Sequence, residues 1–401
     1  ARRTHLFVDV GVRPPSAAAW RTAIQGGQAM LIGVPREVKN HEYRVGLTPE
    51  SVADILKAGH AVLVETNAGN GIGADDAAYR AAGAEIAPDA ATVFGRAEMI
   101  VKVKEPQAAE RAMLRPDQIL FTYLHLAADP EQTRELVASG VTAIAYETVT
   151  DAAGALPLLK PMSQVAGRMS IQAGATALEK AHGGRGVLLG GVPGVQPGRL
   201  VILGGGVVGF HAAENAVGLG ADVTVFDKSA TALERLSTHF GARARVLYAQ
   251  QEPLAAAVAN ADLVIGAVLV PGAAAPKLVT KAMLGGMRRG AVLVDVAIDQ
   301  GGCFETSRPT THADPTFVVG GVVHYCVANM PGAVARTSTY ALNNATLPHV
   351  LRLAALGWRQ ALLSDPHLRR GLNVSQGKVT CEPVAAALSY AYTSPESALA
   401  A

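Results

Sequence analysis

The chain has 401 residues, which suggests two or more domains at about 100 to 200 residues each. Hydrophobic residues make up 49% and charged residues 17%, too apolar and too weakly charged for a disordered protein. With 35 basic and 33 acidic residues, the net charge of +2 argues against a nucleic-acid-binding protein with a broad cationic face. The three cysteines, Cys303, Cys326 and Cys381, lack CxxC spacing. They exclude a disulfide framework and suit a reducing cytosol.

A membrane span needs about 20 apolar residues. The longest apolar run, 263–275, is shorter and is interrupted by Pro271. We therefore attribute the mean hydropathy of +0.23 to the large core of a cytoplasmic protein with no membrane partner.

Residues 1–29 differ from the rest of the chain because they contain four arginines and one acid, Asp9. An Arg-rich, acid-poor segment partly fits a transit peptide. Met30 is followed at once by a strand-like run at 31–35, so we expect residues 1–29 to be an N-terminal extension or a mis-set start.

From Met30 to residue 157, short β-rich runs alternate with helical stretches. This rhythm is typical of βαβ units and predicts a mostly parallel sheet, which we assign to the first part of a substrate domain, 30–157. The predicted helices are 49–57 and about 130–139, and the predicted strands are 61–65, 98–103, 119–123 and 141–145.

A long helix at about 163–182 and a loop at 190–198 open the next section. Four continuous apolar runs follow, as expected for strands covered on both faces, at 200–203, 222–226, 261–270 and 291–298. Residues 336–401 are expected to be helical, with no new strands, and to pack back on the first domain. The predicted fold is α/β: a Rossmann-type, doubly wound dinucleotide domain, 158–335, inserted in a discontinuous α/β substrate domain with a parallel sheet.

A glycine loop directly follows the predicted strand 200–203. Gly204, Gly206 and Gly209 match GxGxxG around Val207 and Val208. In this pattern the first glycine permits a tight turn, the second lets the backbone approach a pyrophosphate, and the third lets helix and strand pack closely. The next strand ends in Asp227, 18 residues past Gly209. A carboxylate there accepts the ribose hydroxyls of NAD and repels the 2′-phosphate of NADP, although the adjacent Lys228 can soften that repulsion. The loop therefore predicts NAD as cofactor.

A nicotinamide enzyme needs a group that handles the proton accompanying the hydride, and histidine is the usual choice. Of the 11 histidines, His125 stands out because it follows the predicted strand 119–123. Ligands of open α/β sheets lie beyond the carboxyl ends of strands. A histidine that caps the strand or packs in the core is the alternative.

Cations for an anionic substrate come from two segments. Lys102 and Lys104 alternate at the end of the predicted strand 98–103, so we place both on one face. Solvated edge lysines are the alternative reading. An arginine can bind a carboxylate through two hydrogen bonds, but spacing does not choose among Arg36, Lys39 and Arg44.

Two aspartates lie in or after the predicted strand 291–298. Asp299 is placed at its end, facing the ligand. Asp295, inside the run, is interpreted as structural.

Several long stretches are similar to the alanine dehydrogenase family, within the superfamily that includes the alpha subunit of nicotinamide nucleotide transhydrogenase. The resemblance covers nearly all of residues 30–401. Its most specific segments are KVKEP (102–106), FTYLH (121–125), PMSQVAGR (161–168), 190–194, DVAIDQGG (295–302) and VANMP (327–331).

The resemblance implies an enzyme that interconverts L-alanine with pyruvate and ammonium, and that assembles as a homohexamer. It implies that Arg44 and Lys104 bind substrate, that His125 is the general acid/base, and that Asp299 assists it. Residues that would line the dinucleotide, besides the glycine loop and Asp227, are Ser163, Val268, Leu269, Val296, Ala297, Ile298, Val327, Ala328, Asn329 and Met330.

Two departures are visible. Gln164 stands where we expect a glutamate. The helix around Arg352 and Leu356 offers no acid–histidine pair, so no protein-bound metal is predicted.

Three other readings stay open from the sequence. One is the NAD-binding part of a nicotinamide transhydrogenase, and another is a saccharopine-type dehydrogenase with a bulkier substrate. A non-catalytic NAD-binding protein is the third, but it would not need Arg44, Lys104, His125 and Asp299 together.

Overall fold

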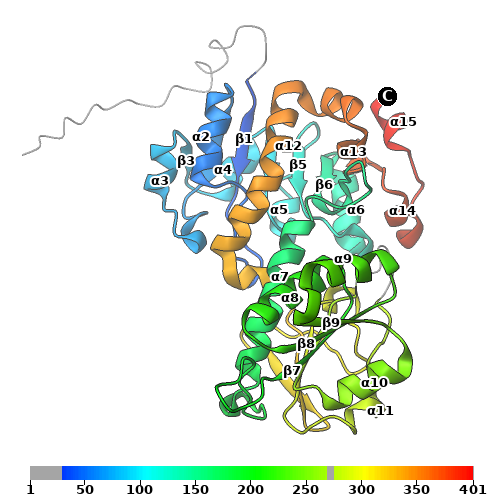
Figure 1. Cartoon of the computed structure of the whole chain (residues 1–401). Coiled ribbons are helices and arrows are strands. Elements are labelled where there is room, and N and C mark those ends of the chain that lie inside the picture. Colours follow the sequence, from blue (N-terminus) through cyan, green and yellow to red (C-terminus); the bar gives the residue numbers. More distant parts are fainter. Residues whose placement is uncertain (1–28, 269–274, 401) are drawn as a thin grey trace, which may run out of the picture. The chain divides into compact units, whose positions relative to one another are not determined.

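A computed structural model describes residues 29–268 and 275–400. The predictions for residues 1–28 and for Leu269 therefore lie outside the described residues. The described chain divides into two units (Figure 1). Unit 1 comprises residues 29–39, 43–156 and 343–400, and unit 2 comprises residues 40–42, 157–268 and 275–342. In the described ranges, no helix has the length and apolar character needed to cross a membrane.

Unit 1 is built on an eight-stranded sheet with the order β15-β14-β6-β5-β4-β1-β2-β3. The strands from β6 to β3 are all parallel, whereas β14 pairs antiparallel with both β6 and β15. The strands are β1 (Leu31–Val34), β2 (Ala61–Glu65), β3 (Glu85–Ala87), β4 (Met99–Val101), β5 (Ile119–Thr122), β6 (Thr142–Ala145), β14 (Leu372–Ser375) and β15 (Lys378–Val379).

The helices of unit 1 begin and end where local sequence signals place them. Thr48 and Asp129 accept N-terminal amide hydrogens of α2 and α6, and each helix has proline in its first turn. Gly140, in the left-handed conformation, ends α6. The helices are α2 (Pro49–Lys57), α3 (Asp76–Ala81), α4 (Ala90–Arg96), α5 (Ala108–Arg111), α6 (Pro130–Ser139), α13 (Pro366–Arg369), α14 (Glu382–Leu388), α15 (Pro395–Ala400) and most of α12 (Ala335–Ser364), with short 3₁₀ turns η1 (Asn70–Ile72), η2 (Leu126–Ala128) and η3 (Tyr146–Thr148).

The prediction that residues 336–401 contain no strand is wrong. Strands β14 and β15 form a hairpin, and β14 extends the unit 1 sheet beyond β6. The connection is a two-residue turn in which Gln376 (φ 49°) and Gly377 (φ 75°) are both left-handed. Two left-handed residues give a turn whose twist matches that of a hairpin. The Gln-Gly pair, which lies between alternating polar and apolar residues, was therefore a usable sequence signal for this hairpin.

Unit 2 contains a seven-stranded sheet with the order β12-β13-β11-β10-β7-β8-β9, in which only β12 runs antiparallel to its neighbour. The strands are β7 (Arg199–Leu203), β8 (Asp222–Asp227), β9 (Ala244–Tyr248), β10 (Leu263–Gly266), β11 (Val292–Asp295), β12 (Thr316–Val319) and β13 (Val322–Tyr325). Because the chain leaves β7 toward β8 and later returns beside β7 as β10, the order reverses between β7 and β10. This doubly wound arrangement confirms the predicted α/β class.

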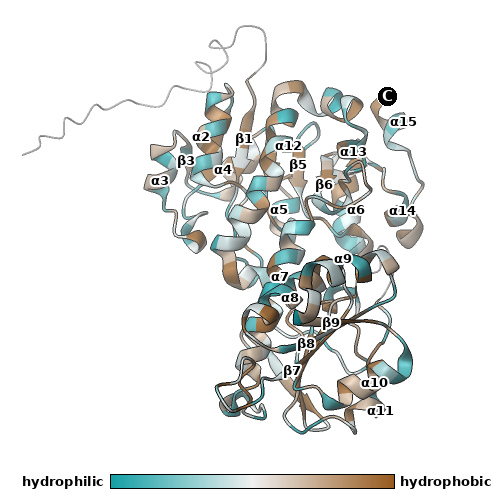
Figure 2. Ribbon diagram, in the orientation of Figure 1, coloured by the Kyte–Doolittle hydropathy of each residue, from teal (hydrophilic) through white to brown (hydrophobic). Residues whose placement is uncertain are grey.

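Both faces of this sheet are covered, as the continuous apolar runs predicted. Leu200 and Ile202 of β7 pack in one core cluster with helices α7, α8 and α9, while Val201 and Leu203 pack in another with α10 and α11. Apolar residues accordingly concentrate on the strands of this unit (Figure 2). The helices and 3₁₀ turns are α7 (Lys160–Ala177), α8 (Val207–Gly218), α9 (Ala230–Phe240), α10 (Gln251–Asn260), α11 (Lys281–Leu284), η4 (Lys180–His182), η5 (Gly241–Arg243), η6 (Ile298–Gln300) and η7 (Met330–Val334).

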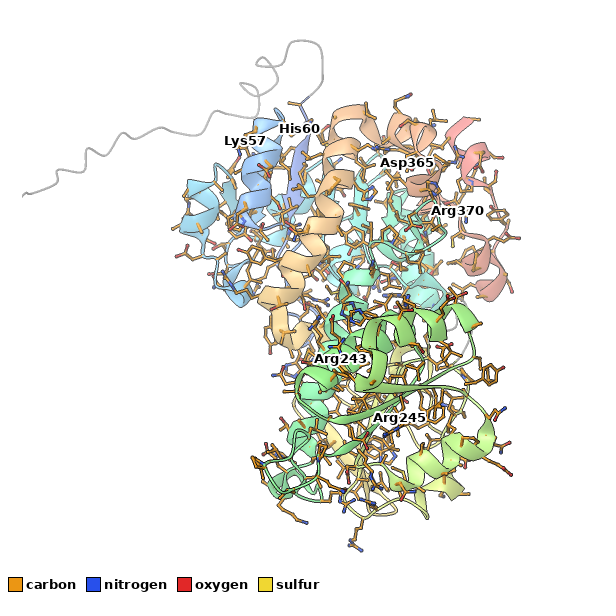
Figure 3. All side chains as sticks on the ribbon, in the orientation of Figure 1. Lys57, His60, Arg243, Arg245, Asp365 and Arg370 are labelled. Carbon is orange, nitrogen blue, oxygen red and sulfur yellow. The ribbon has the colours of Figure 1, made fainter. Side chains whose placement is uncertain are left out.

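The edge strand β9 was not predicted, and three of its five residues, Arg245, Leu247 and Tyr248, are exposed. Arg245 on this strand pairs with Asp222 of β8, and Arg243 precedes the strand (Figure 3). Charged side chains of this kind hinder pairing of an exposed edge with another chain.

Candidate active site

Four neighbouring parallel strands of unit 1, β1, β4, β5 and β6, send their carboxyl ends to the same edge of the sheet. Arg44 lies in the loop after β1, Lys104 follows β4, and His125 follows β5. The structure thus brings these three predicted site residues to one edge. Ligands of such sheets bind at this edge.

Arg44 differs from the other two cations of its segment in burial. The Arg36 side chain is 55% exposed and lies 3.7 Å from Glu65, and Lys39 pairs with Glu105. Arg44 is only 2% exposed. A desolvated guanidinium binds a carboxylate more strongly than a solvated one, so burial favours Arg44 as the substrate-binding cation.

The two lysines of KVKEP do not share a strand face, so this prediction is wrong. Strand β4 ends at Val101, before either lysine. Lys102 is fully buried, with Nζ 3.1 Å from Glu37 Oε2 and 2.6 Å from Glu110 Oε1. Burial disfavours its ammonium ion, but the two carboxylates outweigh this and raise the pKa of Lys102. Lys102 is therefore a structural cation, and the alternative of a solvated lysine fails for it.

Lys104 is half-buried, on a segment whose backbone is fixed from two sides. Oε1 of Glu37 accepts the amide hydrogen of Val103 at 2.7 Å and lies 3.4 Å from the amide nitrogen of Lys104. The Thr122 hydroxyl donates to the carbonyl oxygen of Lys104 at 3.0 Å. The backbone that carries Lys104 is thus anchored both to Glu37 and to the end of β5.

His125 has a left-handed backbone (φ 51°), and its imidazole is about half exposed. Such a conformation is unfavourable for a residue with a Cβ and needs support from its surroundings. Glu147, just after β6, supplies this support. Its Oε1 accepts the amide hydrogens of His125 at 2.6 Å and of Leu124 at 3.2 Å, and lies 3.9 Å from His125 Nδ1. Glu147 was missed from the sequence, although its position at a strand end was a usable signal.

Tyr123 lies beside His125, and the charge of Arg44 acts on its phenol. Its ring is parallel to the imidazole of His125, with centroids 5.8 Å apart. Burial raises the pKa of Tyr123, the nearby Arg44 opposes that rise, and Glu147 adds to it. The buried phenol therefore stays protonated.

In unit 2, the glycine loop joins β7 to α8 at the point where the strand order reverses. Gly204 has φ 105°, and a Cβ there would lie 2.7 Å from the carbonyl oxygen of Ala267. A Cβ on Gly209 would lie 1.7 Å from the carbonyl oxygen of Gly204, so helix and strand approach closely. Among the described residues, no atom lies within 4 Å of a Cβ built on Gly206. The loop thus leaves open space where a pyrophosphate would meet the amide groups at the start of α8.

Asp227 ends β8 beside this loop. Its Oδ2 accepts the amide hydrogen of Gly205 at 2.5 Å, and its Oδ1 accepts that of Ser229 at 2.7 Å. These bonds orient the half-buried carboxylate. Each oxygen can accept a further hydrogen bond, as ribose recognition requires.

The other residues predicted to line a dinucleotide lie in the same unit. Ser163 is on α7, Val268 follows β10, and residues 296–298 and 327–330 follow β11 and β13. Asp299 is also in unit 2, but it does not end a strand as predicted. Strand β11 ends at Asp295, and Asp299 is an exposed residue of the 3₁₀ turn η6.

Gln164, where a glutamate was expected, makes a hydrogen bond with the ring of His211, Nε2 to Nε2 at 3.2 Å. Arg352 pairs with Asp365 (labelled in Figure 3) at 2.6 Å. Within residues 29–268 and 275–400, no group of three or more His, Cys, Asp or Glu side chains is arranged to hold a metal ion.

The fold and the glycine loop define the class of protein, an α/β protein of the dinucleotide-binding type. Unit 2 contains the glycine loop, and unit 1 contains the strand edge with Arg44, Lys104 and His125. Models of the alanine dehydrogenase/PNT family match both parts of the chain, the N-terminal domain at residues 33–166 and the C-terminal domain at residues 170–382. The chain belongs to this family.

Several alanine dehydrogenases are similar over almost the whole chain. An alanine dehydrogenase of Halomonas elongata is 60% identical over 363 residues, covering 90% of this chain and 98% of the relative. One of Mycobacterium tuberculosis is 53% identical and covers 92% of this chain and 100% of the relative. A solved L-alanine dehydrogenase superposes with a TM-score of 0.87 at 55% identity, covering 90% of this chain and 99% of the other. A transhydrogenase from Sinorhizobium meliloti is more distant, with a TM-score of 0.75 at 25% identity, 88% of this chain and 99% of the other.

Proposed function

We propose that this protein is an NAD-dependent alanine dehydrogenase, which oxidises L-alanine with water to pyruvate and ammonium and catalyses the reverse reductive amination. Family membership and high identity to alanine dehydrogenases support this activity. The feature of the chain that supports it most directly is the strand edge of unit 1, where Lys104, His125 and the buried Arg44 follow three neighbouring parallel strands and Glu147 holds the backbone amide of His125.

The dinucleotide would be held by the glycine loop, with Asp227 on the ribose hydroxyls of NAD. Val268, Ser163 and residues 296–298 and 327–330 would line it. When bound, NAD supplies the oxidation by accepting a hydride from the substrate Cα. The fit of the loop to a pyrophosphate rests on the open space at Gly206 and on the amide groups at the start of α8.

The substrate carboxylate would bind Arg44 and Lys104, which would hold the amino acid in one orientation for hydride transfer. Such positioning lowers a barrier by several kcal/mol, up to ~7 to 11. His125 acts as general base toward the water that adds to the imine carbon. It then returns the proton to nitrogen as the carbon–nitrogen bond breaks and ammonium leaves. Asp299 assists by stabilising positive charge at the reacting nitrogen.

A single assay tests the proposal. The protein is mixed with NAD and each of the common L-amino acids at alkaline pH, and formation of NADH is followed by absorbance. Alanine should give the highest rate. Failure to reduce NAD with alanine would refute the function, and hydride exchange between two nicotinamide nucleotides without amino-acid oxidation would favour the transhydrogenase reading.

Matched histidine variants then locate the chemistry. His125→Asn should lower kcat by ~10² to 10⁴ while NADH still binds. His182→Asn, at a half-exposed histidine of η4, serves as the control and should retain wild-type kcat. Equal activity of both variants would remove His125 from the mechanism.

The proposal extends to assembly and location. We infer a cytoplasmic homohexamer, as the family resemblance implies. Light scattering coupled to gel filtration measures the mass of the assembly, and a mass of one chain would contradict it.

A further inference from the structure

The buried carboxylate of Asp295 has no place in the mechanism above, yet it lies at the base of the turn that carries Asp299. Asp295 is fully buried at the end of β11. Burying a carboxylate is costly unless hydrogen bonds compensate it. What it binds therefore indicates why a carboxylate is kept there.

Donors from both ends of one loop converge on this side chain. At the near end, Oδ1 accepts the amide hydrogen of Ala297 at 3.1 Å. At the far end, Oδ2 accepts the amide hydrogen of Cys303 at 2.9 Å and the hydroxyl hydrogen of Ser307, with the amide of Phe304 at 3.4 Å. The loop that these contacts close contains η6 and therefore Asp299.

The closed loop is compact and has a second anchor. Gly301 (φ 84°) and Gly302 (φ 76°) reverse the chain after η6. The Nζ of Lys277 donates to the carbonyl oxygens of both glycines, at 2.5 and 2.8 Å. Asp299 itself is exposed, so its position depends on the loop rather than on packing of its own side chain.

We propose that Asp295 is a positioning residue for the reaction: by closing the loop 296–303, its carboxylate holds the turn that presents the Asp299 carboxylate. This inference rests on the proposed function, because Asp299 takes its role from there.

A carboxylate suits this task better than a neutral side chain. Its two oxygens together accept from Ala297, Cys303 and Ser307, whereas an asparagine has one acceptor oxygen and would turn an NH₂ group toward the remaining donors. Burial raises the pKa of Asp295, and the hydrogen bonds from Ser307 and neighbouring amides oppose that rise. The loop therefore retains a group that burial disfavours, as expected where exact placement matters more than stability.

A double-mutant cycle separates positioning from a general structural role. Asp295→Asn should lower kcat for alanine oxidation by roughly 100-fold, the scale of a misplacement of about 1 Å. In an Asp299→Asn background the same substitution should lower kcat by no more than about 3-fold, because its effect passes through Asp299. Multiplicative effects of the two substitutions would overturn the proposal. Ser307→Ala, which removes one donor, repeats the test should Asp295→Asn fail to fold.

Two adjacent glycines supply a matched pair. An alanine Cβ at 302 would lie 2.5 Å from Asp295 Oδ2, whereas no described atom outside the adjoining residues of the chain lies within 4 Å of a Cβ at 301. Both positions have nearly equal positive φ, so both variants carry similar backbone strain. Gly302→Ala should therefore lower kcat at least roughly 10-fold more than Gly301→Ala. Equal losses would overturn the proposal.

Hydrogen exchange distinguishes failure of this inference from failure of the proposed function. If the wild-type protein does not oxidise alanine, the function is wrong, but the loop can still be measured. Asp295→Asn should speed amide exchange in peptides covering 296–304 and leave peptides of β8 unchanged. Unchanged exchange in 296–304 would refute the role of Asp295 whatever the reaction is.

Discussion

Lys102 and Lys104 are chemically identical side chains two positions apart, but Lys102 is fully buried between two carboxylates whereas Lys104 is half-buried. Lys102→Met removes a fully buried ammonium ion from between Glu37 and Glu110, whose side chains are 2% and 3% exposed. Two buried carboxylates then lack their counter-ion. Breaking a buried ion pair in this way costs about 3 to 5 kcal/mol. At about 2 to 4 °C per kcal/mol for a unit of this size, the melting temperature should fall by roughly 10 °C.

Lys104→Met is the matched control, because it makes the same change of side chain on a half-buried position. Its effect on stability should be about 1 kcal/mol or less. Its effect on the reaction should be large, since the substrate carboxylate loses a cation. We expect a higher KM for alanine and a lower kcat, with NADH binding unchanged.

Thermal unfolding followed by circular dichroism, together with steady-state kinetics, compares the two variants. A second substitution, Glu110→Gln in the Lys102→Met background, should recover part of the lost stability because it removes one unpaired charge. The reasoning fails if Lys102→Met melts within about 2 °C of wild type, or if Lys104→Met is the less stable protein.

Three further predictions concern other residues of the two units. Asp227→Ala should weaken NADH binding by roughly 10-fold or more and reduce discrimination against NADPH; fluorescence titration with both nucleotides checks this, and unchanged affinities would contradict the ribose assignment. Glu147→Gln keeps an acceptor for the amide of His125 but removes the charge, so kcat should fall by ~10- to 100-fold at unchanged melting temperature; wild-type kcat would show that the charge is not used. Burial lowers the pKa of His324 below 6.5. The folded protein therefore binds a proton at this histidine less readily than the unfolded chain does. As the pH falls below 6.5, protonation of the unfolded chain lowers the free energy of unfolding. His324→Gln should make unfolding by denaturant less sensitive to pH between 7.5 and 5.5, and an unchanged pH dependence would argue against this.

The sequence predicted the regular elements best where local signals are strong. Helices α2 and α6 have the predicted bounds, because a capping side chain, a proline and, for α6, a left-handed glycine mark their ends. Four buried strands of unit 2 were found from their apolar runs, but β13, which is also buried, was missed. The hairpin of β14 and β15 and the edge strand β9 were also missed. The hairpin strands are short, and in β14 the polar residues Asn373 and Ser375 alternate with the apolar ones, while β9 contains Arg245.

For the candidate site, the sequence predicted where along the chain its residues lie, but not how deeply each side chain is buried. The rule that ligands lie at the carboxyl ends of parallel strands pointed to His125 and Lys104, and it would also have found Glu147. It could not choose Arg44 over Arg36, or Lys104 over Lys102. That choice depends on burial, which is decided by residues far away in the chain, such as Glu37, 65 residues before Lys102.

A common arrangement explains how exposed, irregular segments present defined side chains. Glu37 accepts backbone amide hydrogens at the segment of Lys104, and Glu147 does so at His125. Asp295 closes the loop around Asp299 in the same way. These segments lie outside the α-helices and strands, and one largely buried carboxylate supplies additional acceptors for the backbone of each. Glu37 lies 67 residues from Lys104 in the sequence, whereas Glu147 lies only 22 residues from His125. The sequence separation between Glu37 or Glu147 and the segment it holds thus varies, whereas the carboxylate–amide hydrogen bonds recur. The arrangement at these two segments is therefore a property of the fold, which no local sequence pattern encodes.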